Sequence, residues 1–107
     1  SGYPFLRELN KCAATHLSLE AAQPGLEAEV LRAVPEKVIL LGVLDLGSPE
    51  AETPAVVADR IRRALEVVPP ERLVAAPDCG MKYLSRDLAF AKLEAMVAGA
   101  RLVRGEL

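Results

Sequence analysis

KVILLGVLD, residues 37–45, is an almost continuous apolar run between a lysine and an aspartate. Such runs are typical of a parallel β-strand that is covered on both faces. The run is far shorter than the roughly 20 apolar residues that a membrane-spanning helix needs. Gly47, Ser48 and Pro49 follow it and are typical of a turn. The segment therefore predicts the middle strand of an α/β sheet.

Two shorter strands are expected before and after this one, over residues 16–19 and 72–76. Apolar residues at helical spacing predict helices between and around the strands. Alternating helices and strands, combined with the right-handed crossover rule, predict a parallel sheet with helices packed on it. The predicted fold class is therefore α/β, with three parallel strands. The expected helices cover residues 3–14, 26–34, 53–68 and 85–103.

The two later helices have clear N-terminal signals. Thr53 and Ser85 are the expected N-caps, and Pro54 suits the first helical position. The alternation of apolar and charged residues predicts which side of each helix faces the core. The expected inward residues are Val57, Ile61, Leu65 and Val68, opposite Asp59, Arg60 and Arg63, in the first of these helices, and Leu88, Ala91, Leu93, Met96 and Val97 in the second.

The composition is that of an ordinary globular domain. The 107 residues are 51% hydrophobic and 26% charged, with a net charge of -2, so we expect a single domain. Acidic and basic residues are interleaved, and we expect no nucleic-acid partner. No basic and then apolar leader opens the chain, so a cytoplasmic protein without membrane contacts is expected. Cys12 and Cys79 are expected to be separate thiols.

Polar side chains follow the expected strands, at the edge where parallel sheets gather reactive groups. Glu20 follows the first strand, Asp45 ends the second, and the turn PDCG with Cys79 follows the third. Cys79 precedes a glycine that lets backbone approach a ligand closely, although a cysteine in a turn can equally be apolar filler. Glu20 suits a metal ligand or a base, and also a solvated charge or a contact to the next helix.

A thiolate and a carboxylate at one edge of the sheet are a plausible part of a zinc site, although a catalytic zinc ion usually has three protein ligands. His16 lies at the start of its strand, roughly 13 Å from Glu20 by strand rise, so we expect a structural role for it. Cys12 falls on the apolar side of the first helix, which favours a core position. Asp45 suits either the binding of a polar substrate group or the capping of the turn that follows it.

Three stretches carry a resemblance to a known family: HLSLE, LGVLDLGSPEAETPAVVADRIRRAL and LEVVPPERLVAAPDCGMKYLSRDLAFAKLEAMVAGARLV. Over nearly the whole chain, the sequence resembles the carboxyl-terminal part of the cobalamin-independent methionine synthase family. The most specific feature is PDCG, followed by a lysine two residues later and by a helix of the type AFAKLEAMVAGA. The order of strand-end glutamate, GVLD, SP, ADRI and PDCG matches the family as well.

The resemblance implies a TIM barrel, of which this chain would supply the last three strand–helix units and the helix before them. It also implies a zinc ion that activates a thiol, generally homocysteine, to accept a methyl group from a methyltetrahydrofolate. Cys79 matches the family's zinc-binding cysteine, and Glu20 matches its zinc-binding glutamate. Asp45, Ser48 and Pro49 fall in the substrate-side loop, so the resemblance implies substrate binding by Asp45 and Ser48.

The chain departs from the family pattern in two ways. The family's loop reads D-x-H-S-P, whereas this chain has Gly47 at the position of the proton-shuttling histidine, which makes a related thiol an alternative acceptor. The family's other zinc ligands, a His-x-Cys pair, come from an earlier strand that these residues do not include. We therefore expect residues 1–107 to be a fragment of a longer catalytic domain, with half of the zinc site and little activity alone.

Copies of a three-strand unit cannot close the family's barrel, since they give six or nine strands instead of eight. The first and last strands are expected to be open edges with exposed apolar faces, which favours pairing with another chain or copy. The alternative interpretation is a non-catalytic α/β assembly module in which Cys79 and Glu20 are relics. A small cofactor-binding domain is less favoured, because no Gly-rich phosphate loop is present.

Overall fold

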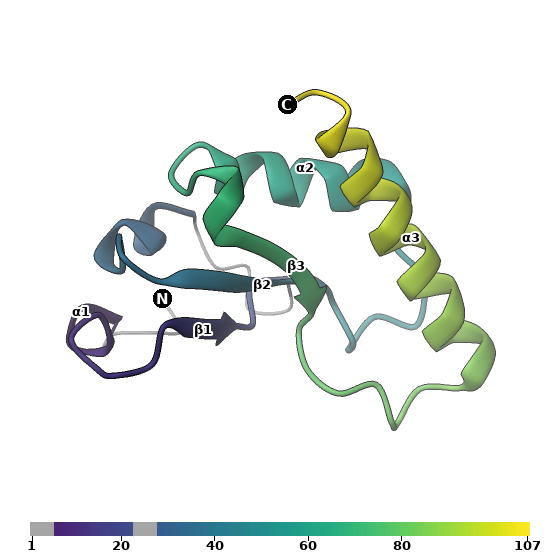
Figure 1. Cartoon of the computed structure of the whole chain (residues 1–107). Coiled ribbons are helices and arrows are strands. Elements are labelled where there is room, and N and C mark those ends of the chain that lie inside the picture. The colour runs from purple at the N-terminus through teal and green to yellow at the C-terminus, as the bar shows by residue number, and fades with distance from the viewer. Residues whose placement is uncertain (1–5, 23–27) are drawn as a thin grey trace.

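Three parallel strands form the sheet of this protein. The computed structural model describes residues 6–22 and 28–107 (Figure 1). The strands β1 (His16–Leu19), β2 (Val38–Leu44) and β3 (Leu73–Pro77) lie in the order β1-β2-β3, and both pairings are parallel. The apolar run is therefore the central strand, and the prediction of three parallel strands alternating with helices is confirmed.

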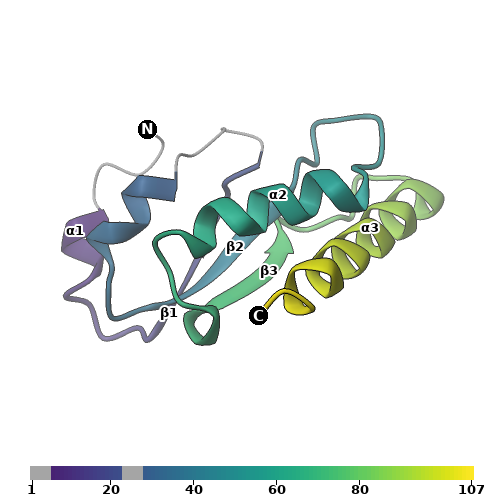
Figure 2. The same ribbon diagram turned by 90° about the horizontal axis from the view of Figure 1, so that it is seen from above.

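Two helices pack side by side on the sheet, as Figures 1 and 2 show. They are α2 (Pro54–Leu65) and α3 (Arg86–Arg104). Within the described residues, no helix is both long and apolar enough to cross a membrane. The other helical segments are short: α1 (Leu6–Leu9), η1 (Ala28–Ala33) and η2 (Pro70–Arg72). Both η1 and η2 are 3₁₀-helices, and η1 lies within the helix predicted over residues 26–34, of which residues 26 and 27 lie outside the described residues.

Both predicted N-caps are confirmed. The Val56 N–H donates to the Thr53 hydroxyl at 3.2 Å, and the Leu88 N–H donates to the Ser85 hydroxyl at 3.2 Å. Each bond satisfies one of the N–H groups that a first helical turn leaves without a partner. The inward residues predicted for α2 are buried or half-buried, as expected: Val57, Ile61, Leu65 and Val68.

The two faces of the sheet are covered to different extents. Ile39, Leu41 and Val43 of β2 are buried in the core beneath the helices. Leu40 points to the other face and is only half-buried, and Val74, its partner on β3, is 46% exposed. The prediction that both faces of β2 are covered therefore holds in part: Val38 and Leu40 are half-buried, and the other residues of β2 are buried. An exposed apolar surface remains on the second face, as expected for a sheet of this size.

The buried side of α3 differs in part from the prediction: Leu88, Ala91 and Met96 are half-buried, as expected, but the fully buried residues include small side chains and one lysine. Gly99 lets α3 approach α2 closely, because a methyl group at this position would lie 2.6 Å from Val57 Cγ1. The predicted inward residues Leu93 and Val97 are instead 37% and 45% exposed. The hydrophobic pattern of α3 did not predict its buried side correctly, because α2 and α3 lie so close together that only small side chains fit between them. The buried residues of α3 are Lys92, Ala95, Gly99 and Val103.

The first helix is shorter than predicted. It ends at Leu9, well before the predicted end, and the predicted start at residues 3–5 lies outside the described residues. The Lys37 ammonium donates to the carbonyls of Cys12, at 2.8 Å, and Ala14. These carbonyls therefore serve a tertiary contact in place of helical hydrogen bonds. Cys12 is exposed, so the core position predicted for it is wrong.

Candidate functional site

Three polar residues follow the three strands at one edge of the sheet, here named the rim. Glu20 comes directly after β1, Asp45 directly after β2, and Cys79 shortly after β3. Because the strands are parallel, their carboxyl ends meet at this edge. Glu20 and Cys79 are exposed, and Asp45 is half-buried. The structure thus brings these predicted site residues to one edge, whereas His16 lies exposed at the opposite end of β1, as expected.

Asp78 joins two segments of the rim. Its N–H donates to the Leu44 carbonyl at 3.2 Å, which extends the pairing of β2 with β3. Its Oδ1 accepts from the N–H groups of Ala21 at 3.1 Å and Ala22 at 3.0 Å, the two residues that follow Glu20. Asp78 is 5% exposed, in contrast to the exposed cysteine beside it. The residue before the candidate thiol is thus bonded to the segment after the candidate carboxylate.

Asp45 and Ser48, the predicted substrate-binding residues, shape their own turn. The Gly47 N–H donates to Asp45 Oδ1 at 2.9 Å, and the Ser48 N–H donates to the Asp45 carbonyl at 3.2 Å. The Glu50 N–H donates to the Ser48 hydroxyl at 3.3 Å. These bonds agree with the alternative that Asp45 caps the turn. Substrate binding by the two residues stays a prediction.

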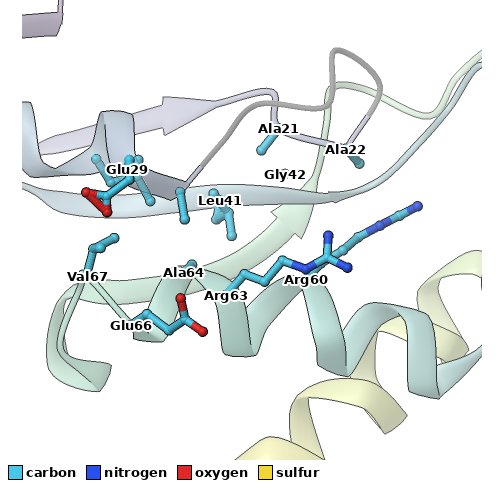
Figure 3. Close-up of a pocket in the computed structure, with 12 residues that line it drawn as sticks. Ala21, Ala22, Glu29, Leu41, Gly42, Arg60, Arg63, Ala64, Glu66 and Val67 are labelled. Carbon is cyan, nitrogen blue, oxygen red and sulfur yellow. The ribbon is translucent and has the colours of Figure 1, made fainter. Parts of the chain in front are cut away.

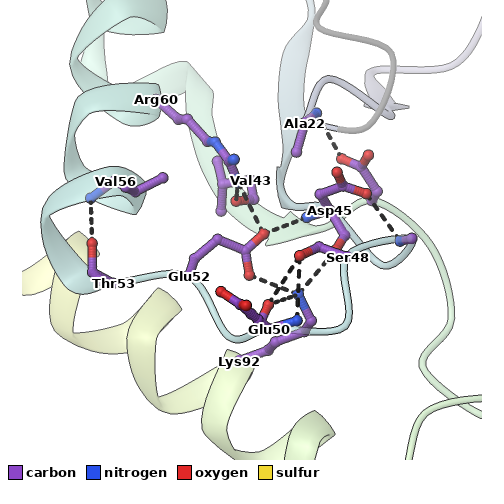
Figure 4. Close-up of polar contacts among 12 residues, drawn as sticks. Ala22, Val43, Asp45, Ser48, Glu50, Glu52, Thr53, Val56, Arg60 and Lys92 are labelled. Carbon is purple, nitrogen blue, oxygen red and sulfur yellow. Dashed lines mark hydrogen bonds and ion pairs between the residues drawn. The ribbon is translucent and has the colours of Figure 1, made fainter.

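Lys92, on α3, is completely buried beneath this turn. Its Nζ donates to the carbonyls of Asp45, at 2.9 Å, and Glu50, at 3.0 Å, and to Glu52 Oε1 at 2.9 Å (Figure 4). The three N–H groups of the ammonium therefore have three acceptors. A buried lysine is stable only with such partners, and these partners lie at both ends of the loop of residues 45–52. Lys92 thus fixes the shape of this loop.

Glu52 completes the network from the far end of the loop. Its Oε2 accepts from the Asp45 N–H at 2.6 Å and from Arg60 Nη1 at 3.0 Å. Arg60, on α2, also donates to the Val43 carbonyl at 2.8 Å. Glu52 and Lys92 therefore hold Asp45 by its N–H and its carbonyl, respectively. The loop is anchored to α2 by the half-buried Arg60 and to α3 by the buried Lys92.

A cavity of about 500 Å³ lies beside the rim, between β2 and α2 (Figure 3). Gly42 lines its sheet side, and Arg60 and Arg63 extend toward it from α2. Neither Glu20 nor Cys79 is among its described lining residues. The two candidate metal ligands therefore do not converge on this cavity.

Known relatives match most of the chain. The sequence model of the family described as "Cobalamin-independent synthase, Catalytic domain" matches residues 4–102. The chain belongs to the cobalamin-independent methionine synthase family. Methionine synthase of Thermococcus kodakarensis is 39% identical over 94 residues, which make up 87% of this chain and 28% of that protein. Methionine synthase of Saccharolobus solfataricus is 46% identical over 72 residues, or 67% of this chain and 22% of that protein.

A solved structure from the cobalamin-independent methionine synthase family has the same fold in this region. It is a B12-independent methionine synthase from Shewanella sp. W3-18-1 in complex with selenomethionine. The TM-score is 0.91, with 34% identity, over 94% of this chain and 30% of that chain. The predicted likeness to part of the family's barrel is thereby confirmed. The chain spans less than a third of the length of these relatives.

Zinc is the metal that the resemblance to methionine synthases implies, and the donors of this chain fit it in kind. Zinc in proteins binds thiolates and carboxylates, and Cys79 and Glu20 expose one of each at the rim. Within residues 6–22 and 28–107, no three His, Cys, Asp or Glu side chains form a group that could hold a metal. Glu20 and Cys79 are two donors, fewer than a complete zinc site has. Metal binding by Glu20 and Cys79 stays a prediction.

Two residues that shape the rim, Asp78 and Lys92, were not predicted from the sequence. The partners of Asp78 Oδ1 are 57 and 56 residues away along the chain, and those of Lys92 are at least 40 residues away. No local pattern reveals contacts at such distances. Lys92 did carry one signal, because it stands at helical spacing from Ala95 and Gly99, in a line of small residues that pack closely.

The network around Glu52 predicts that acid destabilises the chain. Burial alone would raise the pKa of the Glu52 carboxyl, but hydrogen bonds from Lys92, the Asp45 N–H and Arg60 together hold it below its ordinary value of 4.5. Below about this pH the unfolded chain binds a proton that the folded chain still excludes, so stability falls. The contribution is complete above the unfolded pKa and is lost as the pH falls through the lower folded pKa.

Urea unfolding between pH 7 and pH 3 measures this contribution. We expect the difference in unfolding free energy between the unmodified chain and Glu52→Gln to shrink as the pH falls below about 4.5. Glu71→Gln, at an exposed glutamate of η2, is the control and should follow the unmodified chain at every pH. A difference for Glu52→Gln that stays constant across this range would contradict the prediction.

Proposed function

We propose that this chain is part of the catalytic domain of a zinc-dependent methyltransferase, which transfers a methyl group from a methyltetrahydrofolate to homocysteine or a related thiol. Glu20 and Cys79 are two of its zinc ligands in this proposal. One observation carries it: the two residues leave non-neighbouring strands at one rim, and the Asp78 carboxylate joins their segments. Membership of the family and relatives named methionine synthase support the same chemistry. A cytoplasmic setting, expected from the sequence, is part of the proposal.

Each residue of the rim has a part in this proposal. A bound zinc ion would lower the pKa of the acceptor thiol, so that a thiolate is available at neutral pH. Cys79 and Glu20 would hold the metal at the open rim, where a substrate can reach it. Asp45 and Ser48 would orient the polar end of the acceptor from the anchored loop. Gly47 brings no proton acceptor to this loop, so the proton of the thiol would pass to another group or to water.

The proposal also requires a partner that completes the site. Two further zinc ligands and the remaining strands of a barrel would come from a polypeptide segment outside residues 1–107. β1 and β3 are the edges of the described sheet, and strand edges beside exposed apolar residues favour pairing. We therefore propose that such a segment pairs with these edges. The exposed apolar residues nearby are Val74 on β3 and Phe90, Leu93 and Val97 along α3.

Replacement of Cys79 by serine tests the metal site. The chain is mixed with the part of Thermococcus methionine synthase that precedes the matched region and is titrated with Co²⁺, whose thiolate complexes absorb by charge transfer. In Cys79→Ser we expect the band to fall to that of the added segment alone, because serine supplies no thiolate. Glu20→Gln should keep the thiolate–Co²⁺ charge-transfer band, because the thiol is still present. It should weaken Co²⁺ binding more than loss of a residue outside the ligand set does, which is about 10–100-fold.

Cys12→Ser is the matched control for the thiol. Cys12 is exposed but lies before β1, away from the rim, so this variant should change neither the band nor the affinity. An unchanged band in Cys79→Ser would contradict the metal site and favour the non-catalytic assembly module with relic residues. Stoichiometric zinc binding and methyl transfer by the unmixed chain would contradict the need for a completing segment.

A further inference from the structure

The turn after β3 reaches across the sheet. β1 and β3 are not neighbours, because β2 lies between them. Two strand spacings separate them, which amounts to about 9–10 Å. The hydrogen bonds from Ala21 and Ala22 to Asp78 Oδ1 nevertheless connect the ends of β1 and β3 directly. One carboxylate therefore spans the end of the central strand.

Gly42, on β2, leaves the space for this crossing. A methyl group at Gly42 would lie 2.1 Å from Asp78 Oδ1 and 2.9 Å from Asp78 Cα. Both distances are well below the roughly 3.5–4.0 Å at which non-bonded carbon atoms rest. The strand pairing also shifts between Gly42 and Leu44, and such irregularities often redirect side chains near functional sites. A position without a side chain and a shift in pairing together let Asp78 lie over β2.

We propose that Asp78 is the positioning residue of the candidate metal site, whose buried carboxylate fixes Cys79 relative to Glu20. Asp78 directly precedes Cys79, and the two N–H groups that it binds directly follow Glu20. Hydrogen bonds to an ionised acceptor are roughly twice as strong as neutral ones, and this acceptor is almost fully buried. The inference rests on the proposed function, because it requires Glu20 and Cys79 to bind one metal ion.

A purely structural aspartate would behave differently from a positioning residue. It would affect the stability of the chain but not its affinity for metal once the chain is folded. A group that orients metal ligands affects metal affinity, typically by about 10–100-fold. The effect of Asp78 on Co²⁺ binding in folded protein therefore separates the two roles.

The experiment compares Asp78→Ala with Asp78→Asn. Alanine removes the acceptor, whereas asparagine keeps a carbonyl oxygen and nearly the same shape. Asp87→Ala is the matched control, because Asp87 is an exposed aspartate in the first turn of α3. Amide hydrogen exchange at Ala21 and Ala22 reports the hydrogen bonds without metal. Co²⁺ titration of the chain, mixed with the Thermococcus segment as above, reports the site.

In Asp78→Ala we expect faster exchange at Ala21 and Ala22 and Co²⁺ affinity lowered by about 10–100-fold. Asp78→Asn keeps an acceptor oxygen and should recover part of both, with a Co²⁺ affinity between those of the unmodified chain and of the alanine variant. If the alanine variant does not fold, faster exchange with unchanged Co²⁺ affinity in Asp78→Asn would overturn this inference. Faster exchange with unchanged Co²⁺ affinity, while Cys79→Ser loses its band, would overturn this inference alone. An unchanged band in Cys79→Ser would overturn the proposed function and this inference with it.

Discussion

Replacement of Lys92 by methionine is expected to lower the free energy of unfolding by about 3–5 kcal/mol, the range for a buried ion pair that loses one partner. Methionine has a similar length and is apolar. It would leave Glu52 Oε1 and the carbonyls of Asp45 and Glu50 without the buried donor that now binds all three. Buried acceptors without partners are strongly unfavourable. Urea denaturation at pH 7 measures the loss.

Two further variants make this result interpretable. Lys82→Met, at an exposed lysine, should change the unfolding free energy by no more than about 0.5 kcal/mol. The double variant Lys92→Met with Glu52→Gln should recover part of the loss, because it also removes the negative charge whose Oε1 has lost its lysine partner. A loss below about 1 kcal/mol in Lys92→Met, or no recovery in the double variant, would show that the buried network does not stabilise the loop.

Gly42→Ala is expected to have the second largest effect, at the upper end of the roughly 1–3 kcal/mol typical of overpacking. The added methyl group would meet Asp78 Cα at 2.9 Å as well as its carboxylate. A flexible side-chain tip can move aside, but a backbone atom that is paired with β2 cannot do so cheaply. We also expect faster amide exchange at Ala21 and Ala22, because the displaced carboxylate would no longer reach them. Urea denaturation and hydrogen exchange measure the two effects.

Gly80→Ala is the matched control for this variant. Gly80 lies in the same turn as Asp78, but a methyl group there would meet no atom within 4 Å. Its replacement should change the unfolding free energy by no more than about 0.5 kcal/mol. If both variants behave alike, close approach of Asp78 to β2 is not what requires glycine at position 42.

The sequence predicts the framework of this fold well, because its signals are local. The run at residues 37–45 became the central strand, and Thr53 and Ser85 cap their helices as expected. Each signal depends on a few consecutive residues, and neighbouring parts of the chain do not override it. The crossover rule makes the strands parallel, so Glu20 and Cys79, which follow two of them, come to one edge of the sheet.

The predictions that were wrong all involve tertiary contacts. Leu93 and Val97 are exposed because the close packing of α2 and α3 selects Gly99 and Ala95 instead. The first helix ends early where Lys37, a distant residue, binds the carbonyls that follow it. Hydrophobic periodicity indicates the apolar side of a helix but not the element that packs against it, so these tertiary contacts could not be predicted from it.

The candidate site is predictable to a similar extent. Its two donors stand in recognisable positions after strands, and PDCG has a specific resemblance. The residues that hold the donors and the loop in place are Asp78, Gly42 and Lys92, and each acts on parts of the chain far from it in sequence. The candidate donors at the rim can thus be recognised in the sequence, whereas the residues that hold them in place can be recognised only in the folded structure.

The buried position of Lys92 has a consequence for how the protein is made. A ribosome synthesises Asp45 and Glu52 before Lys92, which belongs to α3. Until α3 emerges and docks, the nascent loop lacks the ammonium group that binds its carbonyls in the folded chain. The loop beside the rim therefore takes its final shape only after α3 has been synthesised. A polypeptide interrupted before α3 would carry Glu20 and Cys79 without the lysine that fixes the loop of residues 45–52.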